Sequence, residues 1–118
     1  MKAIVTGGAG FIGSHLVDSL LNENIDVTVL DNFSTGRPEN LEHVREQIEL
    51  VKCDLGVKGD WIKHFINADW VFHLAALADI VPSIQQPEAY FRANVDGTFN
   101  VLQAAKTTEA KRFIYIDS

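Results

Sequence analysis

Cysteine and proline are both scarce in this sequence. The 118 residues include one cysteine, Cys53, so no disulfide can form within the chain, and no Cys/His spacing around it predicts a metal site. Only 3 prolines and 8 glycines interrupt the chain and 47% of its residues are hydrophobic, which excludes a disordered or collagen-like protein. These features predict one globular domain over 1–118, with Cys53 as a small buried hydrophobe.

Positive charge and long apolar runs are scarce as well. Lys and Arg total 10 against 16 Asp and Glu, a net charge of −6, and the basic residues are not clustered. Contacts to nucleic-acid phosphates need clustered basic side chains, so we expect no nucleic-acid partner. No uncharged run reaches the roughly 18 residues of a membrane span. We therefore expect a cytoplasmic protein that does not insert into a membrane.

Short apolar runs alternate along the chain with helical patterns. Helices are predicted at 11–24 and 87–108, and shorter helical segments at 41–47 and 61–66. Strands are predicted at 2–6, 26–31, 48–53, 70–74 and 113–116.

The predicted strands are apolar on both faces, which is typical of a parallel sheet that helices cover on both sides. Polar Glu49 and Lys52 place the third strand at an edge. The predicted fold is a doubly wound, Rossmann-type α/β domain of three layers with strand order 3-2-1-4-5.

The long helical pattern near the end of the chain is apolar on more than one face. Phe91, Val95 and Leu102 form one stripe, while Tyr90 and Val101 lie away from it. One face can pack on the sheet, and the other then needs a partner.

The main chemical signal lies between the first strand and the first helix. The segment Thr6-Gly7-Gly8-Ala9-Gly10-Phe11-Ile12-Gly13 contains the dinucleotide fingerprint Gly-x-Gly-x-x-Gly. In that fingerprint the glycines permit a sharp turn, close approach of a pyrophosphate and tight packing of helix on strand. The amides and dipole at the helix start then attract phosphates. A tight turn that binds nothing is the alternative.

An acidic residue ends the second predicted strand. Asp31 lies 18 residues after Gly13, near the offset of about 20 expected for the carboxylate that binds the adenosine ribose. A carboxylate there repels the extra phosphate of NADP, so the sequence favours NAD. Two alternatives stay open: Asp31 is only a strand-end turn former, or the nearby Arg37 meets a 2′-phosphate.

Small or polar residues follow three other predicted strands. They are Asp54-Leu55, Leu74-Ala75-Ala76 and Asp117-Ser118. In an open parallel sheet the carboxyl ends of the strands form the ligand crevice. Each position alone fits tight packing, but together with the glycine loop they predict a cofactor site.

Five motif segments follow one another along the chain, at 6–15, 31–36, 54–55, 73–76 and 94–100. In this order they resemble the extended short-chain dehydrogenase/reductase family. Within that family they are most similar to the NAD-dependent nucleotide-sugar epimerases and dehydratases of the UDP-glucose 4-epimerase type. The resemblance implies the N-terminal, NAD-binding portion of a longer enzyme, incomplete at its C-terminal side and without the sugar-binding part.

Residue by residue, the resemblance implies contacts to NAD. Amides of Phe11 and Ile12 would face the pyrophosphate, and Asp31 with Asn32 would hold the adenosine ribose. The whole implied cofactor set is Gly7, Gly10, Phe11, Ile12, Gly13, Asp31, Asn32, Ser34, Thr35, Gly36, Asp54, Leu55, Leu74, Ala75, Ala76 and Asn94.

Within that set, Asp54 and Leu55 would flank the adenine. Ala75 and Ala76 would line the cofactor path, and Asn94 would approach the cofactor from the long helix. The resemblance also implies that helix 88–108 pairs with its copy in a homodimer.

The resemblance assigns one catalytic residue, Ser118, which matches the Ser or Thr that hydrogen-bonds the sugar hydroxyl undergoing oxidation. In the family, a downstream Tyr-x-x-x-Lys pair supplies the tyrosine that removes the hydroxyl proton while a hydride passes to NAD. Neither Tyr90 nor Tyr115 is followed by a lysine four residues later. We therefore expect this portion alone to be inactive.

The activity implied for the longer enzyme is epimerisation of a nucleotide-sugar through a keto intermediate. Dehydratases of the family more often carry Thr at the Ser118 position, so Ser118 favours an epimerase. The alternatives are a dehydratase or reductase of the same family, or a stand-alone NAD-binding or NAD-sensing module.

Overall fold

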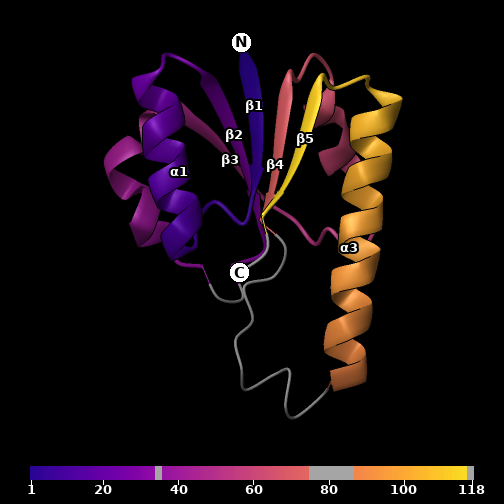
Figure 1. Ribbon diagram of the computed structural model, residues 1–118. Helices are drawn as coiled ribbons and strands as arrows, with labels where there is room; N and C mark the ends of the chain where they lie inside the picture. Colours follow the sequence, from indigo (N-terminus) through magenta and orange to yellow (C-terminus); the bar gives the residue numbers. More distant parts are fainter. Residues whose placement is uncertain (34–35, 75–86, 117–118) are drawn as a thin grey trace.

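The computed structural model describes residues 1–33, 36–74 and 87–116, and for 87–94 the backbone alone. Within these ranges five strands form one parallel sheet in the order β3-β2-β1-β4-β5 (Figure 1). The predicted strand order is therefore confirmed, including β3 at an edge. The strands are β1 (Lys2–Thr6), β2 (Asp26–Asp31), β3 (Ile48–Lys52), β4 (Trp70–Leu74) and β5 (Arg112–Ile116).

In the described residues, the strands alternate with two α-helices and two 3-10 helices. They are α1 (Phe11–Asn22), η1 (Pro38–Gln47), η2 (Asp60–Phe65) and α3 (Pro87–Thr107). Helix α1 ends two residues before the predicted boundary, because Asn24 adopts a left-handed φ of 60° and the amide of Ile25 turns back to the carbonyl of Leu20. The two short helical segments are wound as 3-10 helices, and η1 begins at Pro38, a residue suited to the first helical turn.

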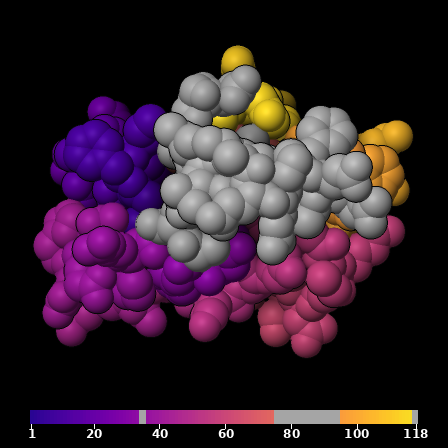
Figure 2. Space-filling view, turned by 90° about the horizontal axis from the view of Figure 1, so that it is seen from below, coloured from indigo at the N-terminus to yellow at the C-terminus, as the bar shows by residue number. Residues whose placement is uncertain are grey.

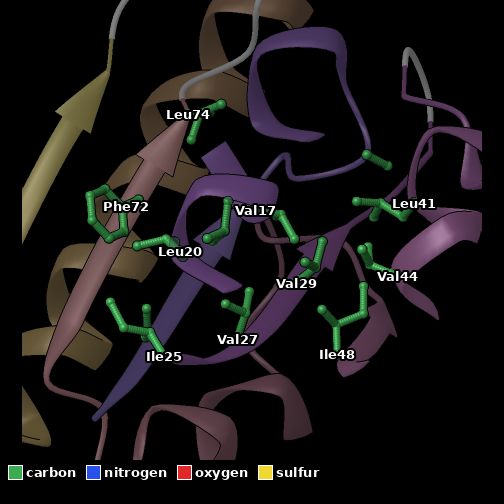
Figure 3. Close-up of a cluster of buried hydrophobic side chains, with 13 residues drawn as sticks. Val17, Leu20, Ile25, Val27, Val29, Leu41, Val44, Ile48, Phe72 and Leu74 are labelled. Atoms are coloured by element: carbon green, nitrogen blue, oxygen red, sulfur yellow. The ribbon is translucent and has the colours of Figure 1, made fainter. Parts of the chain in front are cut away.

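Helix α1 and η1 cover one face of the sheet (Figures 1 and 3). Alternate residues of the strands point toward this face, as the period of two along a strand requires. Val17 and Leu20 of α1 meet the strand side chains from above (Figure 3). The strand and 3-10 residues of this cluster include Ala3, Val5, Val27, Val29, Leu41, Val44, Ile48, Phe72 and Leu74.

Helix α3 and η2 cover the other face. The strand residues between those of the first cluster point here, and Phe65 of η2 is completely buried among them. This second cluster includes Ile4, Leu30, Trp61, Phe65, Val71, Val101, Ala104 and Ala105. Both faces of the central strands are thus apolar and covered, which is the three-layer arrangement that the sequence predicts.

A buried polar chain joins β1, β4 and α3. The imidazole of His73 lies between two threonines, with Nδ1 2.7 Å from Oγ1 of Thr6 and Nε2 3.0 Å from Oγ1 of Thr98. The amide of Leu74 donates to the same Thr6 oxygen at 3.1 Å. That oxygen can accept a second hydrogen bond or donate its own proton, so the tautomer of His73 decides which group donates in its two bonds to threonine. Burial lowers the pKa of His73 to about 4, so the ring is neutral at pH 7.

The buried histidine should make the stability of the chain depend on pH. His73 stays neutral in the folded chain down to about pH 4, whereas in the unfolded chain it takes up a proton below about pH 6.5. The unfolding free energy should therefore be highest above pH 6.5 and fall as the pH drops toward 4. We expect His73 to account for a loss of about 2 kcal/mol between pH 7 and pH 5, measured by urea unfolding.

The matched variants are His73→Gln, which removes the buried titrating group, and His15→Gln, which alters an exposed one. The pH dependence should shrink in His73→Gln and persist in His15→Gln. Equal pH dependence in His73→Gln and the unaltered chain would show that another group is responsible.

Candidate cofactor site

The carboxyl ends of all five strands lie at one edge of the sheet, because the strands run in the same direction. The loops that leave β1, β2 and β3 start at this edge. Figure 2 views the molecule from that side, with the early part of the chain, including α1, opposite α3. The motifs that the sequence singles out therefore gather at the edge where ligands of open parallel sheets bind.

The glycine loop is folded as tightly as its sequence predicts. Gly7 has a left-handed φ of +70°, its amide donates to the carbonyl of Leu30 at 2.8 Å, and a Cβ there would come within 3.2 Å of the Leu74 carbonyl. A Cβ on Gly13 would lie 2.3 Å from the Gly7 carbonyl oxygen, which no side chain tolerates. The start of α1 thus packs directly on the loop because both positions are glycine.

Within the described residues, no side chain caps the amino end of α1. Gly10 occupies the N-cap, makes no side-chain hydrogen bond, and the first turn holds no acidic residue. Among the described residues, a Cβ on Gly10 would meet only the Gly7 carbonyl oxygen, at 3.4 Å. The Phe11 side chain is 75% exposed and points away from the core. Amides and the positive end of the helix dipole are thus presented at this edge, an arrangement that suits an anion.

Asp31 ties the end of β2 to the glycine loop. The residue is 8% exposed, and its carboxylate accepts two hydrogen bonds, at Oδ2 from the amide of Ala9 (3.0 Å) and at Oδ1 from the amide of Phe33 (2.8 Å). A role as a strand-end turn former accounts for the local bond to Phe33 but not for the bond to Ala9. Each carboxylate oxygen can accept a second hydrogen bond, which is the capacity that two ribose hydroxyls require.

Ala9 is the centre of the contacts around this carboxylate. Besides donating to Asp31, it accepts at its carbonyl from the amide of Arg37 at 3.1 Å and from Nδ2 of Asn40 at 2.7 Å. Gly36 fits closely against the same group, since a Cβ there would lie 2.8 Å from the Ala9 carbonyl carbon. The sequence gives no signal for Asn40, because nothing local links it to a position 31 residues earlier.

The loop after β3 lies next to the end of β2. The amide of Cys53 donates to the Asp31 carbonyl at 3.1 Å, and Oδ1 of Asp54 accepts from the amide of Gly56 at 2.9 Å. Asp54 is exposed and Leu55 is half-buried. Burial, with the nearby carboxylates of Asp31 and Asp54, raises the pKa of the Cys53 thiol to about 11. The thiol is therefore protonated at neutral pH and is no nucleophile.

The structure brings most of the predicted cofactor residues to one edge. The glycine loop, Asp31, Asn32, Gly36, the 54–55 pair and buried Leu74 all lie at carboxyl ends of strands or in the loops that follow them. For Asn94 the structure describes only the backbone, within α3. The other predicted residues lie outside the described ranges; they are Ser34, Thr35, Ala75, Ala76 and Ser118.

In 1–33, 36–74 and 87–116, no three His, Cys, Asp or Glu side chains come together as a metal-binding group. Over the same residues, no helix is both long enough and apolar enough to span a bilayer.

The names of the curated proteins that are similar to this chain describe enzymes that act on nucleotide-sugars. A UDP-glucuronic acid decarboxylase 1 from Arabidopsis thaliana is 40% identical over 113 residues, covering 94% of this chain and 25% of the relative. A bifunctional UDP-glucose 4-epimerase and UDP-xylose 4-epimerase 1 from Pisum sativum is 36% identical over 127 residues, covering 99% and 36%. The chain thus spans about a quarter to a third of the length of these relatives.

Solved structures give the same result. UDP-glucose 4-epimerase from Bifidobacterium longum, in complex with NAD+ and UDP, superposes with a TM-score of 0.89 at 31% identity, covering 100% of this chain and 37% of that one. For the dTDP-glucose 4,6-dehydratase DesIV from Streptomyces venezuelae, with NAD bound, the TM-score is 0.86 at 33% identity, covering 96% and 38%.

The family model described as "NAD dependent epimerase/dehydratase family" matches residues 3–118, nearly the whole chain. This match agrees with the strand order, the glycine loop and the position of Asp31. The chain therefore belongs to the NAD-dependent epimerase/dehydratase family.

Proposed function

We propose that this chain is the NAD-binding portion of a nucleotide-sugar epimerase. The observation that carries the proposal is the pairing of an uncapped helix start with a carboxylate that is bonded to the same glycine loop. These two features offer donors for a pyrophosphate and acceptors for ribose hydroxyls a short distance apart. The Bifidobacterium longum and Streptomyces venezuelae structures named above contain NAD, which supports the same cofactor here.

In this proposal the pyrophosphate lies beside Gly7, Gly10 and Gly13 and is bound by the amides of Phe11 and Ile12. Gly10 suits close approach because its missing side chain leaves open space. NAD, when bound, supplies a hydride acceptor for the sugar carbon that carries the hydroxyl.

The adenosine half is held farther along the edge of the sheet. Asp31 and Asn32 bind the ribose, followed by the segment Ser34, Thr35 and Gly36. Asp54 and Leu55 flank the adenine. The remaining contacts are assigned to Leu74, Ala75, Ala76 and Asn94.

Ser118 is the catalytic residue that we assign within this chain. Its hydroxyl would hydrogen-bond the sugar hydroxyl and orient it for loss of its proton. Tyr90 does not fit the family's Tyr-x-x-x-Lys pair, since the residue four places later is Asn94. We propose that the base for that proton lies outside residues 1–118. We therefore propose that the chain binds the cofactor but does not complete the reaction.

A second activity for the whole enzyme is decarboxylation of a nucleotide-sugar acid. The observation that favours it is the 40% identity to a UDP-glucuronic acid decarboxylase 1. Dehydration is supported in the same way by the structural similarity to DesIV. The non-enzymatic alternative is a stand-alone NAD-binding module.

We further propose that α3 forms a homodimer contact. Its residues Val101, Ala104 and Ala105 are buried against the sheet and η2, as one apolar face of the predicted helix requires. On the other side, Val95, Phe99 and Leu102 are 49%, 57% and 46% exposed, at helical spacing. An apolar stripe of this kind is typical of a helix that packs on another helix.

The proposed cofactor site is tested by calorimetric titration of the chain with NAD and with NADP. We expect NAD to bind and NADP to bind more weakly, because Asp31 repels a 2′-phosphate. Gly10→Ala should keep the melting temperature, since its Cβ has one contact at 3.4 Å. It should weaken NAD binding roughly tenfold or more, because the methyl group enters the space of the pyrophosphate.

The control is Gly59→Ala, whose Cβ would contact only the Trp61 ring, at 3.7 Å and beyond. It should bind NAD like the unaltered chain. The absence of both heat and thermal stabilisation on adding NAD to the unaltered chain would refute the proposed site.

The proposed lack of turnover is tested with UDP-glucose, UDP-glucuronic acid and NAD. Without a tyrosine base, the chain should release no UDP-galactose, no UDP-xylose and no NADH above the level without protein. Products are separated by anion-exchange chromatography. Turnover by the purified chain would show that another residue serves as the base.

The proposed dimer is tested by analytical ultracentrifugation. The unaltered chain should sediment as a dimer, and Phe99→Glu should sediment as a monomer because it places a charge in the apolar stripe. Gln103→Glu, which adds the same charge at an exposed polar position of α3, should remain dimeric. A monomeric unaltered chain at high micromolar concentration would refute the contact.

A further inference from the structure

Asn100 is a buried polar residue whose partner lies far away in the sequence. Its side chain, on α3, is 8% exposed. Nδ2 donates to the carbonyl of Leu55 at 2.8 Å, across a sequence separation of 45 residues. Leu55 belongs to the loop of residues 54–57 between β3 and η2, which we call the 54–57 loop. A buried carboxamide bonded to a loop backbone restrains the loop more than an apolar contact does, because the bond is directional.

Gly97, one turn before Asn100, brings α3 close to the same loop. A Cβ on Gly97 would lie 3.7 Å from Cβ of Leu55 and 3.9 Å from the amide nitrogen of Gly56. These are ordinary van der Waals distances, so an alanine fits there and a larger side chain does not. The helix therefore approaches the loop at two positions one turn apart. Gly97 lies against it, and Asn100 is hydrogen-bonded to it.

The other contacts of the 54–57 loop come from neighbouring parts of the chain. Cys53 donates to the Asp31 carbonyl at one end. At the other end, Nε1 of Trp61 donates to the carbonyl of Val57 at 2.8 Å. Within the loop, Asp54 accepts from the amide of Gly56. Within the described residues, Asn100 supplies the hydrogen bond that holds the middle of the loop from α3, a helix that packs against β4.

We propose that Asn100 is a positioning residue for the adenosine half of the cofactor. The proposal rests on the proposed NAD site, in which Asp31 binds the ribose and residues 54–55 flank the adenine. Ribose and adenine are joined covalently, so their two binding sites must keep a fixed separation. Cys53 fixes the start of the loop to Asp31, and Asn100 fixes Leu55 two residues later. Asn100 acts through the loop and does not itself touch the cofactor.

The test is a double-mutant cycle on NAD affinity, measured by calorimetry on the whole 118-residue chain. Asn100→Ala should weaken NAD binding about tenfold, because the released loop must then be ordered when NAD binds. Asp54→Ala should weaken it by removing a group beside the adenine. If Asn100 acts through the loop, the double variant should bind little more weakly than Asp54→Ala alone. Gln103→Ala, at an exposed position of the same helix, is the matched control and should bind normally.

A second pair of variants covers the case in which Asn100→Ala does not fold. Gly97→Ala fits the observed space and should keep NAD affinity, while gaining helix stability. Gly97→Leu should push the loop away and reproduce the loss of affinity. Additive effects in the cycle, or normal affinity in both Asn100→Ala and Gly97→Leu, would overturn the positioning role. Failure of the unaltered chain to bind NAD would overturn the proposed function itself, which is a different result.

Discussion

The hydrogen bond from the amide of Ala9 to the carboxylate of Asp31 is the contact on which the proposed site depends. It joins the loop after β1 to the end of β2 at 3.0 Å, and both groups are buried. Arg37 and Asn40 donate to the carbonyl of Ala9, which belongs to the next peptide group. Two successive peptide groups of the glycine loop are thus restrained before any ligand arrives, so less ordering entropy opposes binding.

The sequence predicts the strands and their order well because each signal is local. Short apolar runs predict the strands to within a residue, and their alternation with helices predicts the parallel order. The glycine spacing identifies the turn, since positive φ at Gly7 and the 2.3 Å approach at Gly13 are requirements of the backbone alone.

What the sequence does not reveal are contacts between distant residues. Nothing near Asn40 or Asn100 indicates a bond to Ala9 or Leu55, because both side chains suit an exposed helix equally well in sequence. The Thr6–His73 bond spans 67 residues and exists only once β1 and β4 are in register. Such pairs depend on tertiary packing. A pattern of apolar residues predicts which faces are buried but not which polar side chains meet.

The net charge of −6 raises the question of how an acidic chain can receive a dinucleotide that is itself an anion. Two parts of the sheet edge differ in the charge that they present to a ligand. At the glycine loop, backbone amides and the helix dipole face the ligand, and no carboxylate lies in the first turn of α1. The carboxylate bonded to this loop, that of Asp31, already accepts two amide hydrogens that partly offset its charge. In the proposed site it would favour neutral hydroxyls, because a second phosphate at that point would face the carboxylate.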